Sequence, residues 1–148
     1  MADHVRKQVR DAIVTALTGL TTTQNRVFRS RVYPLSVADL PGLCVQMPVE
    51  ETSPSTIHVP ALQERNIDLA VSAYVEESAD LDDELDAIAK EVETALSSIL
   101  TVAGVNVEPI YVGMDTEFDG EAEKPHGVMR IRYRVRVFTA ANAPDTLL

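Results

Sequence analysis

Val128-Met-Arg-Ile-Arg-Tyr-Arg-Val-Arg-Val-Phe-Thr139 alternates apolar and polar side chains along its length. Successive side chains of a β-strand point to opposite faces of a sheet, so this period of two predicts a strand with one buried face. The other face carries arginines roughly 7 Å apart. We call this row the arginine ladder: Arg130, Arg132, Arg134 and Arg136. Such a strand belongs to a sheet that needs cover on one side only.

The preceding segment, residues 105–118, is predicted to be the hairpin partner of this strand, joined to it by the polar connection 119–126. Pairing Asp115 with Arg130 keeps the apolar side chains of both strands on one face, whereas a slip of one residue would mix the faces. In this register the opposed apolar pairs are Ile110 with Val135, Val112 with Tyr133, and Met114 with Ile131. Tyr111 and Glu117 then fall on the arginine face.

Three further strands are predicted upstream, over residues 26–33, 43–49 and 66–76. The last is the clearest, because every second residue from Ile67 to Val75 is apolar. The intervening residues 50–62 are predicted to form a long loop or a mobile arm, since they contain the turn-forming residues Ser53, Pro54, Ser55 and Pro60.

Two amphipathic helices are predicted, over residues 4–20 and 80–100. In each, apolar side chains recur at spacings of three and four and form one face. Asp3 is the expected N-cap of the first helix, and Gly19 is expected to end it. The second helix opens with acids, where the helix dipole favours negative charge: Asp82, Asp83, Glu84 and Asp86.

The predicted order of elements, α-β-β-β-α-β-β, indicates an α+β fold. It is a two-layer sandwich in which a mostly antiparallel sheet carries two main helices on one face. The length of 148 residues fits a single domain over residues 1–148. Flexible loops are expected near 50–62 and 119–126, with a short C-terminal tail from about 141.

Composition argues against several classes of protein. No apolar run approaches the roughly 20 residues that span a bilayer, and the N-terminus lacks the apolar core of a signal peptide. Cys44 is the only cysteine, so no intrachain disulfide is possible. Tryptophan is absent and aromatic residues make up 5% of the chain, which disfavours a platform for stacking bases or sugars. Synthesis in a reducing cytoplasm is expected.

Charge is distributed unevenly along the chain, whose formal net charge is −10. Residues 50–123 hold nineteen acids and only two bases, Arg65 and Lys90, whereas the other residues hold eleven bases and four acids. Either these segments neutralise each other inside one domain, or they form two opposite surface patches that meet on neighbouring subunits.

The arginine ladder has the same two interpretations, because like charges in a row need partners. It is either a solvated face neutralised by cross-strand acids such as Asp115, Glu117, Asp68 and Glu76, or an interface with an acidic patch on another subunit. The candidate interface residues are Arg29, Arg31 and the ladder on one side, and Asp82, Asp83, Glu84 and Asp86 on the other. Phosphate binding is less favoured, because the whole chain is acidic.

Catalysis and metal binding find little support in the sequence. His4, His58 and His126 show no pairing pattern, and no catalytic or phosphate-binding motif is present. Cys44 lies in a predicted strand, where a lone cysteine is usually a small buried hydrophobe. The acids spaced by two from Asp80 to Asp86 resemble a calcium loop, but Leu85 stands where that loop needs glycine. No cofactor or metal ion is expected, although a site assembled by the fold stays open.

The order and spacing of several short segments resemble the minor tail protein U family of tailed phages, the tail terminators. The resemblance covers residues 4–140. It comprises the opening helix, Arg31-Val-Tyr-Pro-Leu35, Ala38-Asp-Leu-Pro-Gly-Leu43, the strand Arg65–Val75, the helix Asp82–Leu96 and the closing arginine-rich strand.

This resemblance implies a virion structural protein at the head-proximal end of the tail. Such proteins form a ring, expected to be a hexamer, on the end of the tail tube. The ring stops tube polymerisation and presents a surface for head joining. The implied partners are copies of itself, the tail tube protein and a head-completion or connector protein, while genome DNA passes through the channel without specific binding. The family offers no catalytic residues to transfer.

Two other interpretations stay open. One is another neck or tail-completion protein. The other is a small ligand-binding domain or enzyme, which would require a concave pocket with convergent polar groups.

Overall fold

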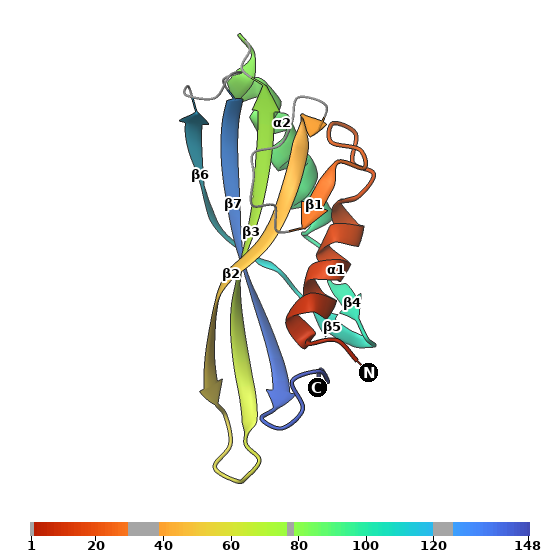
Figure 1. The fold of residues 1–148 in the computed structure, drawn as a ribbon, viewed down its shortest axis with the longest axis vertical. Helices are drawn as coiled ribbons and strands as arrows, with labels where there is room; N and C mark the ends of the chain where they lie inside the picture. The colour runs from red at the N-terminus through yellow and green to blue at the C-terminus, as the bar shows by residue number, and fades with distance from the viewer. Residues whose placement is uncertain (1, 30–38, 77–78, 120–125) are drawn as a thin grey trace.

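The computed structural model describes residues 2–29, 39–76, 79–119 and 126–148 (Figure 1). This part of the chain forms two helices, a five-stranded sheet and a two-stranded sheet. In chain order the elements are α1 (Val5–Leu17), β1 (Val27–Arg29), β2 (Gly42–Pro54), β3 (Leu62–Glu76), α2 (Leu81–Ala95), β4 (Leu100–Val102), β5 (Val105–Val107), β6 (Ile110–Asp119) and β7 (His126–Ala140).

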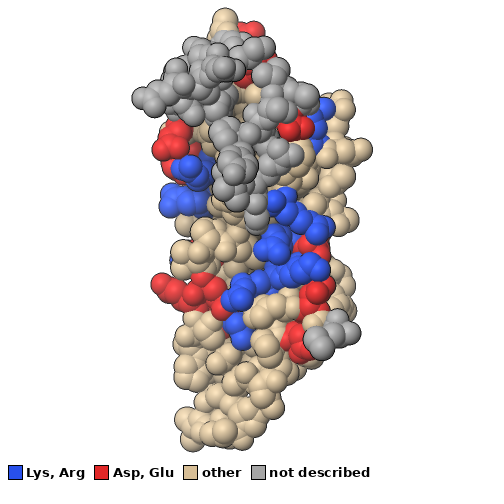
Figure 2. All heavy atoms as spheres, in the orientation of Figure 1, with Lys and Arg blue, Asp and Glu red and all other residues tan. Residues whose placement is uncertain are grey.

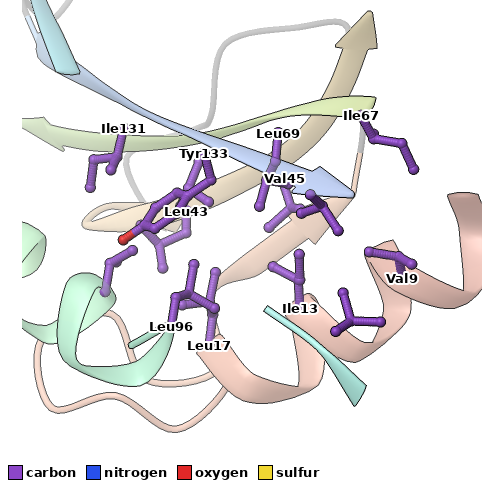
Figure 3. Close-up of a cluster of buried hydrophobic side chains, with 14 of the residues drawn as sticks. Val9, Ile13, Leu17, Leu43, Val45, Ile67, Leu69, Leu96, Ile131 and Tyr133 are labelled. Atoms are coloured by element: carbon purple, nitrogen blue, oxygen red, sulfur yellow. The ribbon is translucent and has the colours of Figure 1, made fainter. Parts of the chain in front are cut away.

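The large sheet has the strand order β1-β2-β3-β7-β6, and its neighbouring strands are antiparallel except for β1 and β2. Both helices pack on one face of it, where their apolar side chains meet those of the strands in a single core (Figure 3). The core residues labelled there include Ile13 and Leu17 of α1, Leu69 of β3 and Tyr133 of β7. The predicted α+β sandwich, with helices on one face of a mostly antiparallel sheet, is confirmed.

Helix α1 buries Val5, Val9, Ile13 and Leu17, one residue in every turn. Its N-cap is His4 and not Asp3, because the Nδ1 atom of His4 accepts a hydrogen bond of 3.1 Å from the backbone N–H of Arg6. The carboxylate of Asp3 instead pairs with Lys7 at 2.7 Å. Gly19 follows the end of the helix with a φ of +92°, which favours glycine.

Helix α2 ends at Ala95, so the prediction that it continues to residue 100 was wrong. The next elements, β4 and β5, form a small hairpin whose turn residues Ala103 and Gly104 have φ values of +48° and +80°. Positive φ at both central positions is the geometry of a tight two-residue hairpin turn. The end of the helix was not visible in the sequence, because Leu96 and Leu100 keep the helical spacing of four and both side chains pack against apolar neighbours.

The predicted strand 105–118 is two strands, β5 and β6, separated at Glu108 and Pro109. In the β6–β7 hairpin the pairs Asp115 with Arg130 and Met114 with Ile131 are confirmed. A bulge at Val112 then shifts the register, so that the remaining predicted pairs were wrong: Tyr111 lies opposite Tyr133, and Ile110 lies opposite Arg134. An extra residue in one strand produces this shift.

Residues 50–54, predicted as part of a loop, continue β2 in antiparallel pairing with β3, and the turn spans only residues 55–61. Residues 50–66 thus form a hairpin that projects beyond the helices at the lower end of Figure 1, and we call it the arm. The prolines that indicated a loop are compatible with the hairpin, because Pro54 closes its strand and Pro60 lies in the turn.

A buried charge cluster lies where the arm leaves the core. The Oε2 atom of Glu50 accepts hydrogen bonds from Arg65 at 3.0 Å and from Arg6 of α1 at 3.3 Å. The Nε atom of Arg65 donates to the hydroxyl of Thr139 on β7 at 2.9 Å. Arg65 is 8% exposed, so these contacts join β2, β3, β7 and the start of α1 in a site largely shielded from solvent.

The residues predicted as a C-terminal tail from about 141 fold back onto the domain. The backbone N–H of Leu148 donates to Phe138, and that of Val5 donates to Pro144. Leu147 is buried in the core.

Candidate assembly surfaces

The arginine ladder lies on the face of the sheet that the helices leave open. The residues between its members, Met129 to Val137 at every second position, are buried, so the arginines project to the opposite side. Figure 2 shows this face, with Lys and Arg gathered in a band across its middle and Asp and Glu at the margins.

Three of the four ladder arginines pair with acids on adjacent strands. Arg130 contacts Asp115 at 3.6 Å and Glu117 at 3.2 Å, Arg134 contacts Asp68 at 3.7 Å, and Arg136 contacts Glu64 at 3.1 Å. Asp115, Glu117 and Asp68 were predicted partners, whereas Glu64 was not, and Glu76 lies opposite His126. The arginine side chains are about half exposed, so each pair contributes only about 0–1 kcal/mol.

Arg132 differs from its neighbours, because it forms no ion pair or hydrogen bond with any residue that the structure describes. It borders a hollow of about 240 Å³ that Arg130, Arg134, Asp68 and Val112 also line. The ladder therefore contains one guanidinium without an acidic partner in the described ranges.

The predicted acidic patch lies on the first turns of α2, on the helix side of the sheet. Asp82, Asp83 and Asp86 are exposed and Glu84 is half-buried. Within the residues described, none of these acids forms an ion pair. One chain therefore holds the acids and the ladder on opposite sides of its sheet, and whether they meet between chains stays a prediction.

Arg29 does not widen the ladder. It pairs in the sheet with the core-facing Val45, and its side chain contacts Asp11 of α1 at 3.1 Å. It therefore lies on the helix side. Arg31 lies outside the described residues.

An apolar patch, which the sequence reading missed, lies along β6. β6 is an edge strand of the large sheet. Four of its apolar residues are each 47–56% exposed: Ile110, Tyr111, Val112 and Met114. The bulge at Val112 places apolar side chains on both faces of the strand. Tyr111 also packs edge-on against Tyr133, with ring centroids 5.6 Å apart. We call these four residues the β6 edge patch.

The outer part of the arm is an uncharged surface with two exposed aliphatic side chains. Residues 52–63 include no Asp, Glu, Lys or Arg. Ile57 and Val59, at the turn, are fully exposed. In Figure 2 the lower end of the molecule correspondingly shows neither blue nor red atoms.

The residues considered for catalysis are not brought together. His4 caps α1, His58 is exposed in the arm turn, and Cys44 is buried as predicted. Over the described ranges, no group of three or more His, Cys, Asp or Glu side chains is placed to hold a metal ion. No helix there is long and apolar enough to cross a membrane.

Comparisons with known proteins give a fold-level likeness only. No protein-family model matches the chain, and no curated protein matches it. A chain of the solved structure "Virion of native gene transfer agent (GTA) particle" is similar, with a TM-score of 0.49 and 20% identity over 90% of this chain and 92% of that chain.

Proposed function

We propose that this chain is a phage virion structural protein, a tail terminator whose copies form a ring on the end of the tail tube. The ring stops tube polymerisation and offers the surface to which the head is joined. A hexamer is expected from the sequence resemblance over residues 4–140. In this role the chain catalyses no reaction and uses no cofactor.

The exposed apolar residues of the β6 edge patch are the observation that best supports self-assembly. A long edge strand presents unpaired backbone groups, and one that also exposes apolar side chains tends to pair with another chain. At the other edge of the sheet, the described residues of β1 pair with β2 at Leu43–Val45, and the rest of β2 has no partner on that edge within the described ranges, so this is a second and different edge. Contacts between two different surfaces of identical subunits close into rings when the rotation allows it.

Charge fits a ring through which DNA passes without being gripped. Three of the four ladder arginines pair with nearby acids, Asp115, Glu117, Asp68 and Glu64, so among the described residues the ladder leaves Arg132 as a single unpaired charge and not a continuous cationic track. Binding to the phosphate backbone depends on such positive charge.

The first test is the mass in solution by light scattering after size exclusion, at low and high salt. A mass near six subunits is expected. Dissociation on adding salt would point to the charged patches, whereas persistence would point to the β6 edge patch, because salt screens exposed charges but not apolar contacts. A monomer under all conditions would count against self-assembly through these surfaces.

Met114→Glu is expected to disrupt the ring, because it places a charge in the β6 edge patch. Ile99→Glu is the matched control, since Ile99 is 58% exposed, compared with 47% for Met114, but lies beyond α2 and away from β6. Equal loss of assembly in both variants would indicate a general effect of the added charge.

A second test separates a tail terminator from another neck or tail-completion protein. Purified tail tubes are incubated with the protein and then with tube subunits. A terminator is expected to bind one tube end and to block elongation there, whereas continued elongation would favour the alternative.

A further inference from the structure

The hollow beside Arg132 follows from the register of the sheet. Arg132 lies between Ala70 of β3 and Gly113 of β6. Its two cross-strand neighbours are therefore the methyl group of alanine and the hydrogen of glycine. Arg130 and Arg134, two positions away on either side, have the acids Asp115 and Asp68 as neighbours in the same pairings. The strands thus leave space beside one arginine of the ladder and place no carboxylate directly opposite it.

The guanidinium of Arg132 leans over Gly113. Its Nη2 atom lies 3.4 Å from where a Cβ atom of residue 113 would stand. A side chain at position 113 would therefore stand against the guanidinium that borders the hollow. Pro48 and Val112 form an apolar rim, which suits the methylene groups of an entering side chain.

The charge of the surroundings restricts the ligand. Arg130 and Arg134 are already paired with acids, so the hollow holds one uncompensated positive charge. A polyanion would need several such charges and would meet the carboxylates of Asp68 and Asp115. A single carboxylate fits, because guanidinium groups bind carboxylates through two parallel hydrogen bonds.

We propose that the Arg132 hollow receives a carboxylate side chain from the first turns of α2 of a second copy of this chain. That segment holds Asp82, Asp83, Glu84 and Asp86, which form no ion pair within the part of the chain described. It lies across the sheet from the hollow, so the contact joins two chains. The inference rests on the proposed self-assembly and names one of its contacts.

Zero-length carbodiimide cross-linking of the variant Arg132→Lys tests the contact, because this reagent joins an amine to a carboxylate that touches it. A covalent bond between position 132 of one chain and residues 82–86 of another is expected in the assembled protein. Arg136→Lys is the control, since residue 136 faces Glu64 of its own chain and should give an intrachain link.

Substitution of Gly113 gives an independent measurement. Gly113→Glu supplies the hollow with a carboxylate of the same chain, and Gly113→Gln fills the same space without charge. The association constant, measured by sedimentation, is expected to fall roughly tenfold or more for Arg132→Gln, since loss of one partner of an interfacial charge pair is costly. The association constant of Gly113→Glu should fall at least as far as that of Gly113→Gln. Thermal unfolding of each variant checks that the fold is retained.

The outcomes separate the two proposals. A ring of wild-type protein with no link from position 132 to residues 82–86, or with unchanged association in Arg132→Gln, overturns the assigned contact and leaves the ring intact. A wild-type protein that never associates overturns both.

Discussion

At the scale of single residues, His4 couples the stability of the protein to pH. Burial, followed by the nearby Arg6 and Arg65, lowers the pKa of His4 below its usual value of 6.5. The neutral ring is also the form whose Nδ1 atom accepts the capping hydrogen bond. Because the folded state disfavours protonation, this stabilisation is present above pH 6.5 and is lost as the pH falls.

We therefore expect the free energy of unfolding to decrease between pH 7 and pH 5 by more in the wild type than in His4→Asn. Asparagine keeps an N-cap acceptor that does not titrate, and a cap contributes about 1 kcal/mol. Urea denaturation of both proteins at the two pH values measures the difference. Identical pH dependence in both would show that His4 does not contribute.

Tyr133 carries a buried hydroxyl that has no hydrogen-bond partner in the described part of the chain. Burial, with Glu93 and Tyr111 adding to it, raises the pKa of Tyr133 to about 12. Tyr133→Phe keeps the ring packing and removes the unpaired group. It is expected to raise the free energy of unfolding by about 1 kcal/mol.

The pKa of Tyr133 also gives a test at alkaline pH. The unfolded state loses the tyrosine proton near pH 10 and the folded state only near pH 12, so stability should fall between these values and fall less in Tyr133→Phe. Tyr74→Phe is a control for the gain at neutral pH only, because Tyr74 is not among the buried side chains without a hydrogen-bond partner, whereas burial raises the pKa of Tyr74 as well. A loss of stability in Tyr133→Phe would show that the hydroxyl is satisfied.

At the scale of secondary-structure elements, the cluster of Glu50 and Arg65 anchors the arm to the core. Arg65→Met leaves Glu50 without its most buried partner and is expected to cost about 3 kcal/mol or more, because an uncompensated buried charge remains. The double variant Arg65→Met with Glu50→Met should recover much of that loss. Arg136→Met, which breaks the exposed pair with Glu64, should cost no more than about 1 kcal/mol. Urea denaturation of the four proteins tests this order.

The elements that the sequence predicted correctly have a periodic apolar face. Strict alternation defines β3 and β7, and spacings of three and four define α1 and α2, because each pattern matches one local geometry. Element boundaries were less accurate where periodicity gave no signal. The apolar spacing of Leu96 and Leu100 runs past the end of α2 into the next hairpin. The prolines of the arm indicate a turn but not where its strands begin.

The candidate surfaces were predicted only in part, for a related reason. The faces of the ladder follow from alternation within β7, and two of its acidic neighbours, Asp115 and Glu117, follow from the hairpin register. The bulge at Val112 depends on how β6 fits β7, so neither the β6 edge patch nor the hollow beside Arg132 is visible in the sequence. Arg29 was misplaced because its face is set by pairing between β1 and β2.

At the scale of the whole molecule, the charged face of the sheet and the outer part of the arm, where residues 52–63 carry no Asp, Glu, Lys or Arg, have separable roles. The side chains of Ile57 and Val59 stand in solvent at the tip of the arm, and exposed aliphatic side chains in a projecting hairpin suit contact with another protein. In a tail terminator the arm has two candidate partners, the tube end and the neighbouring subunit. Neither partner is present in the isolated domain, so neither contact contributes to its stability.

We expect the double variant Ile57→Ser with Val59→Ser to keep the wild-type free energy of unfolding to within about 0.5 kcal/mol, as is usual for surface substitutions, and to lose binding to purified tail tubes. Ile99→Ser, which alters another exposed aliphatic residue, should bind tubes normally.

Light scattering of the double variant then shows which partner the arm contacts. A ring that no longer binds tubes indicates a contact with the tube, whereas a monomer indicates a contact between subunits. Unchanged ring formation together with unchanged tube binding would show that the apolar tip has no part in assembly, which would leave the β6 edge patch as the principal apolar interface.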